Sequence, residues 1–290
     1  MQLEVQYNDG HIERVVSDAS WRMTTEGPLR SADMFDGDVY DAQRTMTGWT
    51  EPGFDDSAWQ PAGVVDVSGT LLVAQRNEPI RVIREITPVA VTEPCPGVYV
   101  FDMGQNFAGW CRVQVRGKAG QTITLRHGEV LRPDGTAYTD NLGAGVAVDH
   151  FTLRGTGVEV FEPRFTYHGF RYVEVSGLTE TPGLDMLTGC VVTSNVREVG
   201  EFECSEPLLN KLWQNILWTQ RANMYGIPTD CPQRAERLGW AGDIRVFAQT
   251  GCFNMDMAAF LSKWTVDMRD AQTADERYPD FAPHPYDPTT

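Results

Sequence analysis

Basic residues are few in this sequence and never clustered. Its 290 residues include 24 lysines and arginines against 40 aspartates and glutamates, so the formal net charge is −16. Proteins that bind nucleic acid or anionic membranes present a basic patch, and no run of basic residues here could follow a line of phosphates. We therefore expect neither nucleic acid nor a membrane as a partner.

Long apolar segments and targeting signals are also lacking. No run of 18 apolar residues occurs, which a membrane-spanning helix would need. The first ten residues alternate polar and apolar side chains and have neither the basic start nor the apolar stretch of a secretory signal. The location stays open on these grounds, with the cytoplasm slightly favoured.

The six cysteines form no recognisable site. They are scattered without C-x-x-C spacing or a paired histidine, so neither a zinc site nor a disulfide framework is indicated. No Gly-rich phosphate loop follows a predicted strand. We expect no cofactor and no metal.

The first two thirds of the sequence have the pattern of β-strands. Residues 3–7 and 12–16 alternate around an Asn-Asp-Gly turn, which predicts a β-hairpin. Short β-rich runs separated by Gly, Pro, Asn and Asp then predict an antiparallel sandwich. The predicted strands of the sandwich are 81–86, 98–102, 111–115, 122–127, 148–153 and 171–175.

A helical period begins after about residue 200. Ser205 is the predicted N-cap of a helix over 205–224, and two more helices are predicted over 240–252 and 255–272. One face of the first helix carries Leu208, Leu212, Asn215, Ile216, Thr219 and Asn223.

Together these patterns predict a multidomain β + α chain. A partial N-terminal β module over 1–77 precedes a β-sandwich domain over 78–200, and 201–290 begins a helical domain. Three amphipathic helices cannot enclose a core, so we expect the helical part to continue beyond this chain. We also expect several of its apolar side chains to be exposed in this chain alone, namely Leu212, Ile216, Phe247, Phe260 and Trp264.

The stretch 229–243 is unusually rich in charge for its surroundings. It holds Asp230, Glu236 and Asp243 with two arginines, and apolar helices flank it. A buried carboxylate is costly unless it is paired or hydrogen-bonded, so these groups are either solvated at a helix mouth or held for chemistry. Asp243 alone also fits an acid in the first turn of a helix, and Trp240 alone fits a core tryptophan.

Three segments resemble the bacterial α-L-rhamnosidases, the inverting glycoside hydrolases of family 78. They are 230–240 (DCPQRAERLGW), 101–110 (FDMGQNFAGW) and 165–172 (FTYHGFRY). Further likeness in 40–42 and 48–49 extends the resemblance through almost the whole chain. One departure is Ala235, where many members carry an acidic residue.

The resemblance implies antiparallel β-sandwich modules followed by the first helices of an (α/α)6 barrel, most of which is absent here. It implies that Glu236 is the general acid and that the general base lies beyond residue 290, so that this chain alone is nearly inactive. The implied substrate is a rhamnose-containing glycoside or polysaccharide. The implied pocket for its terminal rhamnose is lined by Asp230, Arg234, Trp240 and Asp243.

The residue types are consistent with this chemistry. Inversion needs a protonated acid on the leaving oxygen and a second carboxylate about 6.5–9.5 Å away that activates water. Burial and the like charges of Asp230 and Asp243 would keep Glu236 protonated, whereas neighbouring arginines oppose this. We expect the carboxylates to prevail, with the heads of Arg234 and Arg237 turned towards the aspartates.

Two function classes remain open. The first is a glycosidase that releases terminal α-L-rhamnose, and the second is a non-catalytic carbohydrate-binding β-sandwich protein with a helical appendage. Glu236 distinguishes the two classes. A lectin-like module needs no carboxylates at a helix mouth and would use its loop tryptophans instead. A third, weaker alternative is an inverting glycosidase for another sugar.

Overall fold

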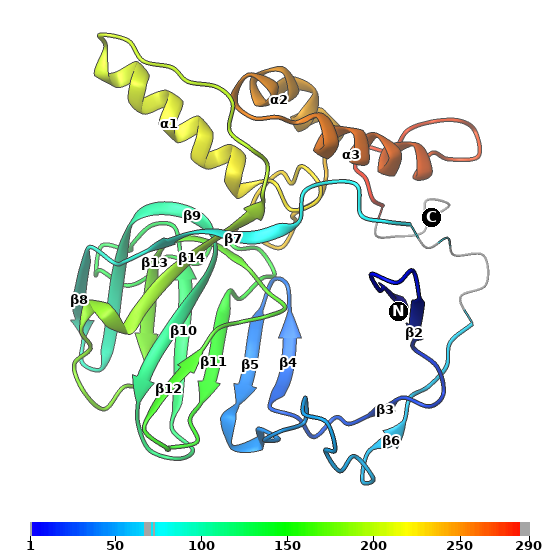
Figure 1. Ribbon diagram of the computed structural model, residues 1–290. Helices are drawn as coiled ribbons and strands as arrows, with labels where there is room; N and C mark the ends of the chain where they lie inside the picture. Colours follow the sequence, from blue (N-terminus) through cyan, green and yellow to red (C-terminus); the bar gives the residue numbers. More distant parts are fainter. Residues whose placement is uncertain (1, 67–70, 72, 285–290) are drawn as a thin grey trace. The chain divides into compact units, whose positions relative to one another are not determined.

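A computed structural model describes residues 2–66, 71 and 73–284, which form two compact units (Figure 1). Unit 1 comprises Met1–Pro28 and Arg44–Ala74, and unit 2 comprises Leu29–Gln43 and Gln75–Thr290. None of the helices in the described part of the chain is long and apolar enough to cross a membrane. The end of the predicted helical segment, 285–290, lies outside the described residues.

Unit 1 contains two small antiparallel sheets. β1 (Gln2–Gln6) pairs with β2 (Ile12–Val16), which confirms the predicted hairpin. β3 (Arg22–Met23) pairs with β6 (Gln60–Pro61). The short 3₁₀ helix η1 (Ala42–Arg44) lies where the chain passes from unit 2 back to unit 1.

Unit 2 is built on one curled ten-stranded sheet (Figure 1). Its strands are β4 (Leu29–Asp33), β5 (Gly37–Asp41), β7 (Ile80–Ile86), β8 (Ala90–Cys95), β9 (Val98–Arg116), β10 (Thr122–Gly128), β11 (Val148–Thr152), β12 (Val158–Phe161), β13 (His168–Ser176) and β14 (Leu187–Ser194). The order is β4-β5-β11-β10-β13-β9-β14-β7, and β8 and β12 also pair with β9. The pairs are antiparallel except for the parallel pair of β5 and β11 among the strands described.

The sheet encloses a core of large apolar side chains. The largest of them are fully buried and come from five strands: Phe101, Phe107, Ile123, Leu125, Phe151, Phe170 and Leu187. Alternate residues along a strand point to opposite faces, and β9 shows this where Cys111, Val113 and Val115 all enter the core. The predicted β-rich fold class is confirmed, and the short 3₁₀ helix η2 (Leu184–Met186) leads into β14.

The strand β9 differs from the sequence prediction, which divided it into two strands. Gly104 and Gly109 lie inside it with φ of +72° and +153°, a region that side chains rarely adopt. A Cβ on Gly109 would lie 1.9 Å from the Cys190 carbonyl oxygen. These glycines therefore allow a bent strand and a close neighbour instead of a turn. The strands β4, β5, β8 and β12 were not predicted at all.

Three helices follow the sheet, close to the predicted positions. They are α1 (Pro207–Ala222), α2 (Ala241–Asn254) and α3 (Ala258–Asp270). The N-cap of α1 is Glu206 and not Ser205, because its carboxylate accepts the Leu208 N–H at 3.1 Å.

The helices share a second, smaller core. Its buried members are Val196, Leu217, Met224, Met255, Met257 and Phe260. Phe260 is 0% exposed and Trp264 is 8% exposed, so the prediction that both are exposed is wrong. Trp264 is covered by the chain that follows α3, where the Ala282 carbonyl accepts its indole N–H at 3.2 Å.

The helix α1 packs through a different face from the one marked by its apolar spacing. Leu208 is exposed and Leu212 is 52% exposed, the latter as predicted. Leu217 and Gln220 are the buried residues of the helix. The Gln220 amide donates to the Gly251 carbonyl of α2 at 3.2 Å, so a polar side chain takes part in the packing.

Candidate functional site

The segment between α1 and α2 is a loop closed on itself by Asp230. The Asp230 N–H donates to the Leu238 carbonyl at 3.1 Å, and the Asp230 Oδ1 accepts the Leu238 N–H at 2.9 Å. The second oxygen, Oδ2, lies 3.8 Å from Nη2 of Arg234. Asp230 therefore fixes both ends of the loop while one of its oxygens still faces a cation.

Glu236 lies in this loop with both carboxylate oxygens in contact with other side chains. Its Oε2 lies 2.5 Å from Nη2 of Arg234, and its Oε1 accepts the indole N–H of Trp240 at 3.0 Å. The side chain is 29% exposed, and that of Arg234 is 48% exposed. The expectation that Arg234 turns away from Glu236 is therefore wrong, because this cation lies between two carboxylates and nearer to Glu236.

Arg237 turns to the sheet and is 3% exposed. Its Nη1 donates to the carbonyls of Met34 at 2.7 Å and Tyr167 at 2.6 Å. The guanidinium carbon lies 4.4 Å from the ring centroid of Tyr167 and 5.3 Å from that of Phe35. Burial lowers the pKa of the Arg237 guanidinium from its usual value. The predicted contact with an aspartate is again wrong, because these partners come from distant segments that local sequence does not reveal.

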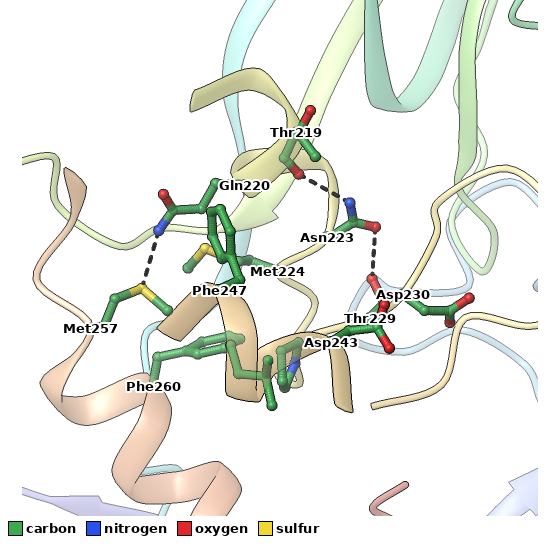
Figure 2. Close-up of a pocket in the computed structure, with 12 residues that line it drawn as sticks. Thr219, Gln220, Asn223, Met224, Thr229, Asp230, Asp243, Phe247, Met257 and Phe260 are labelled. Carbon is green, nitrogen blue, oxygen red and sulfur yellow. Dashed lines mark hydrogen bonds between the residues drawn. The ribbon is translucent and has the colours of Figure 1, made fainter. Parts of the chain in front are cut away.

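Asp243 lies in the first turn of α2 and is exposed. It shares with Asp230 a cavity of about 190 Å³ between α1, α2 and α3 (Figure 2). Phe247 and Phe260 form part of its apolar wall. On the polar side, the amide of Asn223 donates to the Thr219 carbonyl at 3.1 Å. The structure thus joins Asp230, Arg234, Glu236 and Trp240 in one chain of contacts, and Asp243 lines the same cavity as Asp230.

Other lining residues of this cavity were not predicted as site residues. Asn223, Phe247 and Phe260 were noted only for their helical spacing, which is the same for a core residue and for a cavity wall. Nothing in the sequence near 229–243 indicates which residues contact Arg237.

The loop also holds a possible ligand set, Asp230, Cys231 and Glu236, whose atoms lie within 4.8 Å of one another. Burial raises the pKa of the Cys231 thiol to about 11, so the thiol is protonated at neutral pH. Arg234 already supplies a positive charge to both carboxylates. This arrangement favours an ion-paired loop over a metal centre.

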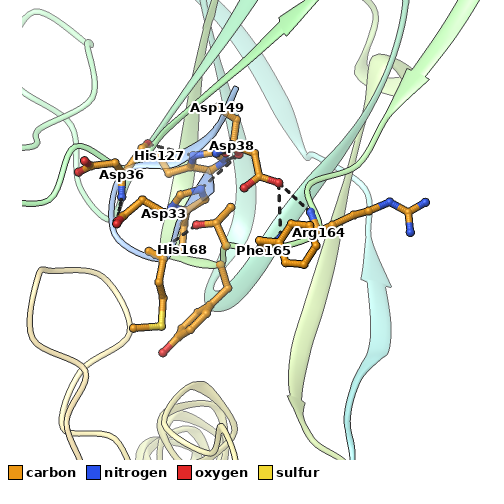
Figure 3. Close-up of polar contacts among 12 residues, drawn as sticks. Asp33, Asp36, Asp38, His127, Asp149, Arg164, Phe165 and His168 are labelled. Carbon is orange, nitrogen blue, oxygen red and sulfur yellow. Dashed lines mark hydrogen bonds and ion pairs between the residues drawn. The ribbon is translucent and has the colours of Figure 1, made fainter. Parts of the chain in front are cut away.

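A second cluster of ionisable side chains is buried within the sheet (Figure 3). The Asp149 Oδ1 accepts the Asp38 N–H at 2.8 Å, and its Oδ2 lies 3.2 Å from Nε2 of His168 and 3.9 Å from Nε2 of His127. The imidazole rings are stacked, with centroids 4.1 Å apart and planes at 17°. A metal bound by both nitrogens would have to lie near both ring planes, which stacked rings do not permit. The cluster is therefore a buried carboxylate in hydrogen-bonding contact with one imidazole, with a second imidazole stacked beside it.

Comparison with known proteins covers nearly the whole chain. Three family models match it: the α-L-rhamnosidase N-terminal domain at 1–84, the bacterial α-L-rhamnosidase concanavalin-like domain at 92–193, and the bacterial α-L-rhamnosidase 6 hairpin glycosidase domain at 197–290. The last of these begins just before α1 and includes the loop with Glu236.

Curated relatives are also named α-L-rhamnosidases. An α-L-rhamnosidase of Streptomyces avermitilis is 51% identical over 283 residues, which are 97% of this chain and 27% of that protein. One from Formosa agariphila is 39% identical over 276 residues, which are 93% of this chain and 30% of that protein. The chain thus spans less than a third of the length of these two relatives.

Solved structures agree in fold. The Streptomyces avermitilis α-L-rhamnosidase complexed with L-rhamnose matches with a TM-score of 0.93 and 51% identity, over 98% of this chain and 28% of that one. The native enzyme from Aspergillus terreus matches with a TM-score of 0.92 and 41% identity, over 98% of this chain and 33% of that one. From its three domains and these relatives, the chain belongs to the family of bacterial α-L-rhamnosidases.

Proposed function

We propose that the protein containing this chain releases terminal α-L-rhamnose from glycosides or polysaccharides by hydrolysis with inversion, with Glu236 as the general acid. The observation that carries the proposal is the setting of Glu236, a partly exposed carboxylate held by Trp240 and Arg234 in a loop beside a cavity. The Streptomyces avermitilis relative was solved with L-rhamnose, which supports rhamnose as the sugar.

The proposed acid role requires Glu236 to carry a proton when it meets the leaving oxygen. The carboxylate is engaged by Arg234 at 2.5 Å, so this pair must open before Glu236 can pass a proton to the leaving oxygen. Arg234 already lies 3.8 Å from Asp230, and a small movement of its exposed head would exchange one carboxylate for the other. We therefore propose that substrate binding transfers Arg234 to Asp230 and leaves Glu236 free to be protonated.

Asp230 is unsuited to be the general base. Its carboxylate and that of Glu236 have oxygens within 4.8 Å of each other. Inverting enzymes separate the two carboxyl groups by about 6.5–9.5 Å, so that water fits on the far side of the sugar ring. We propose that Asp230 and Asp243 accept sugar hydroxyls and that the base lies outside residues 1–290. The base would take a proton from water as oxygen bonds to the anomeric carbon, and Glu236 would give its proton to the departing oxygen.

We propose a second role for Trp240, in contact with the sugar. Its indole N–H holds the Glu236 carboxylate, and its ring packs edge-on with Phe281 at a centroid distance of 4.9 Å. The remaining ring surface suits the C–H face and 6-methyl group of a deoxy sugar. The apolar wall of Phe247 and Phe260 in the neighbouring cavity has the same chemical character.

The test is hydrolysis of p-nitrophenyl α-L-rhamnopyranoside by the full-length protein. We expect Glu236→Gln to lower kcat by about 10²–10⁴-fold, the usual contribution of general acid catalysis, with little change in KM. Glu201→Gln, an exposed glutamate in the segment before α1, is the matched control and should behave as wild type.

Two outcomes would reject the proposal. If Glu236→Gln keeps wild-type kcat, the general acid is a different group. If the full-length protein binds rhamnose without hydrolysing the substrate, it is a carbohydrate-binding protein. Proton NMR of the first product distinguishes the mechanisms, because inversion releases β-L-rhamnose and retention releases the α anomer.

A further inference from the structure

Arg237, the residue after the proposed general acid, is a buried cation that forms no salt bridge with a carboxylate in the described part of the chain. Its two short hydrogen bonds go to backbone carbonyls, of Met34 and Tyr167. Its Nε and Nη2 have no hydrogen-bond partner in the part of the chain that the structure describes. Buried charges are normally paired, so a cation kept here in neutral surroundings calls for a specific reason.

The backbone at Arg237 is also unusual. Its φ is +55°, in the left-handed region that residues other than glycine seldom adopt. The residue before it forms a tight turn, in which the Glu236 N–H donates to the Arg234 carbonyl at 2.9 Å. Backbone of this kind persists where surrounding contacts determine it, and such positions gather at functional sites. The turn directs the Glu236 side chain towards Trp240 and the Arg237 side chain towards the sheet of unit 2.

The loop that carries Glu236 lies directly against loops of the sheet. The Ala235 N–H donates to the Leu142 carbonyl at 3.1 Å. A Cβ on Gly169 would lie 2.8 Å from Cγ of Pro232, so the start of β13 and this loop touch without space for a side chain. Close packing and one backbone hydrogen bond hold the near side of the loop, and the Arg237 side chain extends from it to the Tyr167 carbonyl.

Two distant segments of the sheet meet at the guanidinium. Met34 and Phe35 lie between β4 and β5, and Tyr167 directly precedes β13. The planar fork of arginine can donate to two carbonyls while its faces rest on two rings, whereas a lysine ammonium cannot reproduce both contacts. The ring of Tyr167 in turn stacks on that of Tyr225, with centroids 3.8 Å apart, just before the motif.

We propose that Arg237 is a positioning residue, which fixes the peptide of Glu236 against the sheet so that the carboxyl group stays in place to protonate the leaving oxygen. The proposal rests on the proposed function and extends it, because it gives the β-rich part of unit 2 a role in the chemistry. Arg237 itself touches no substrate in this role. Its effect is on how often the acid is correctly placed, and so on kcat more than on KM.

The experiment compares two substrates in the full-length protein. A rhamnoside with an alkyl leaving group depends on protonation of the departing oxygen, whereas the 2,4-dinitrophenyl rhamnoside departs as a stable anion and needs little help from an acid. We expect Arg237→Met to lower kcat on the alkyl rhamnoside by about 100-fold and on the dinitrophenyl rhamnoside by less than about fivefold, with KM nearly unchanged on both. Arg237→Lys, which keeps the charge but not the fork, should lie between wild type and Arg237→Met.

The matched control is Arg221→Met. Arg221 is a largely buried arginine of α1 that pairs with Glu198 and rests on the ring of Trp218, so its loss tests the same chemical change away from Glu236. We expect the kcat of Arg221→Met on each of the two substrates to match that of wild type. A second variant, Phe35→Leu, removes one ring from Arg237 and leaves both carbonyls. We expect a smaller loss of kcat than in Arg237→Met, again greater on the alkyl rhamnoside than on the dinitrophenyl rhamnoside.

The two proposals fail in different ways. If Arg237→Met lowers kcat equally on both substrates, or if it fails to fold and Phe35→Leu shows no preference, Arg237 only supports the fold and the positioning role is wrong. If Glu236→Gln itself loses activity equally on both substrates, the acid assignment is wrong whatever Arg237 does.

Discussion

Two clusters of ionisable side chains in unit 2 are built in contrasting ways. The cluster of His127, Asp149 and His168 lies on strands, is fully buried, and is fixed by ring stacking. The cluster around Glu236 lies on a loop, and Arg234 contacts two carboxylates there with a half-exposed head. One arrangement keeps its partners unless the sheet opens, and the other can change partners by a side-chain movement. We expect changes in the first to affect stability and changes in the second to affect the reaction.

The largest effect on stability is expected for Asp149→Ala. This change leaves His168 without its carboxylate and the Asp38 N–H without its acceptor, both inside the sheet. Removing one member of a buried pair costs about 3–5 kcal/mol. Hydrogen exchange of peptides from β10, β11 and β13 in the full-length protein would measure the loss of local stability.

Asp140→Ala is the control for that change. Asp140 pairs with Arg132 at 2.5 Å, but its side chain is exposed. Exposed pairs contribute about 0–1 kcal/mol, so exchange in the same peptides should barely change. Equal effects of the two substitutions would remove the contrast between buried and exposed pairs.

Lowering the pH should reduce the free energy of unfolding of the sheet because of His127. Burial lowers the pKa of His127 from 6.5 to about 3 in the folded protein. The unfolded chain therefore takes up a proton as the pH falls below 6.5 while the folded protein does not, and the free energy of unfolding falls by about 1.4 kcal/mol per pH unit until the pH approaches the folded pKa. Asp149, whose pKa is held below its usual value by the histidines despite burial, adds a loss of the same sign at lower pH.

Hydrogen exchange of the same three strands between pH 7 and 4.5, corrected for the intrinsic exchange rates, measures this slope. His127→Phe should reduce it by about 1.4 kcal/mol per pH unit, because the substituted ring does not titrate. The exposed His11, changed to Gln, should leave the slope as in wild type. A slope that is the same in His127→Phe and wild type would mean that another group senses the acid.

The smallest effect is expected for Trp240→Phe, and it should fall on the reaction alone. The change keeps a flat ring but removes the N–H that donates to Glu236 at 3.0 Å. Without this contact the carboxyl group of Glu236 is less well placed, so we expect kcat on an alkyl rhamnoside to fall by about tenfold. Thermal unfolding should be unchanged, and a large drop in the unfolding temperature would show that the indole supports the fold instead.

The sequence predicted local structure well where one segment decides its own conformation. The first hairpin follows from alternation around a turn, and the three helices follow from period and breakers. It failed where the outcome depends on a distant partner. The glycines of β9 were interpreted as turns because nothing nearby in sequence shows that Cys190 packs against one of them.

The candidate site divides in the same way. The five residues of the motif could be selected from their chemistry and their resemblance to a family, and the contacts among Asp230, Arg234 and Glu236 lie within one loop. The direction of each arginine head was predicted wrongly. Arg234 pairs with the nearest carboxylate, and Arg237 finds carbonyls of segments far away in the chain.

The parallel pairing of β5 with β11 has a consequence for dividing this chain by protein engineering. The segment Leu29–Gln43 leaves unit 1, adds β4 and β5 to the sheet, and returns to unit 1 through η1. A truncation at residue 77 would thus uncover one edge of β11, whose unpaired backbone groups could recruit strands from other molecules. It would also remove Met34 and Phe35 from Arg237, so a fragment that keeps the whole sheet must begin no later than residue 29.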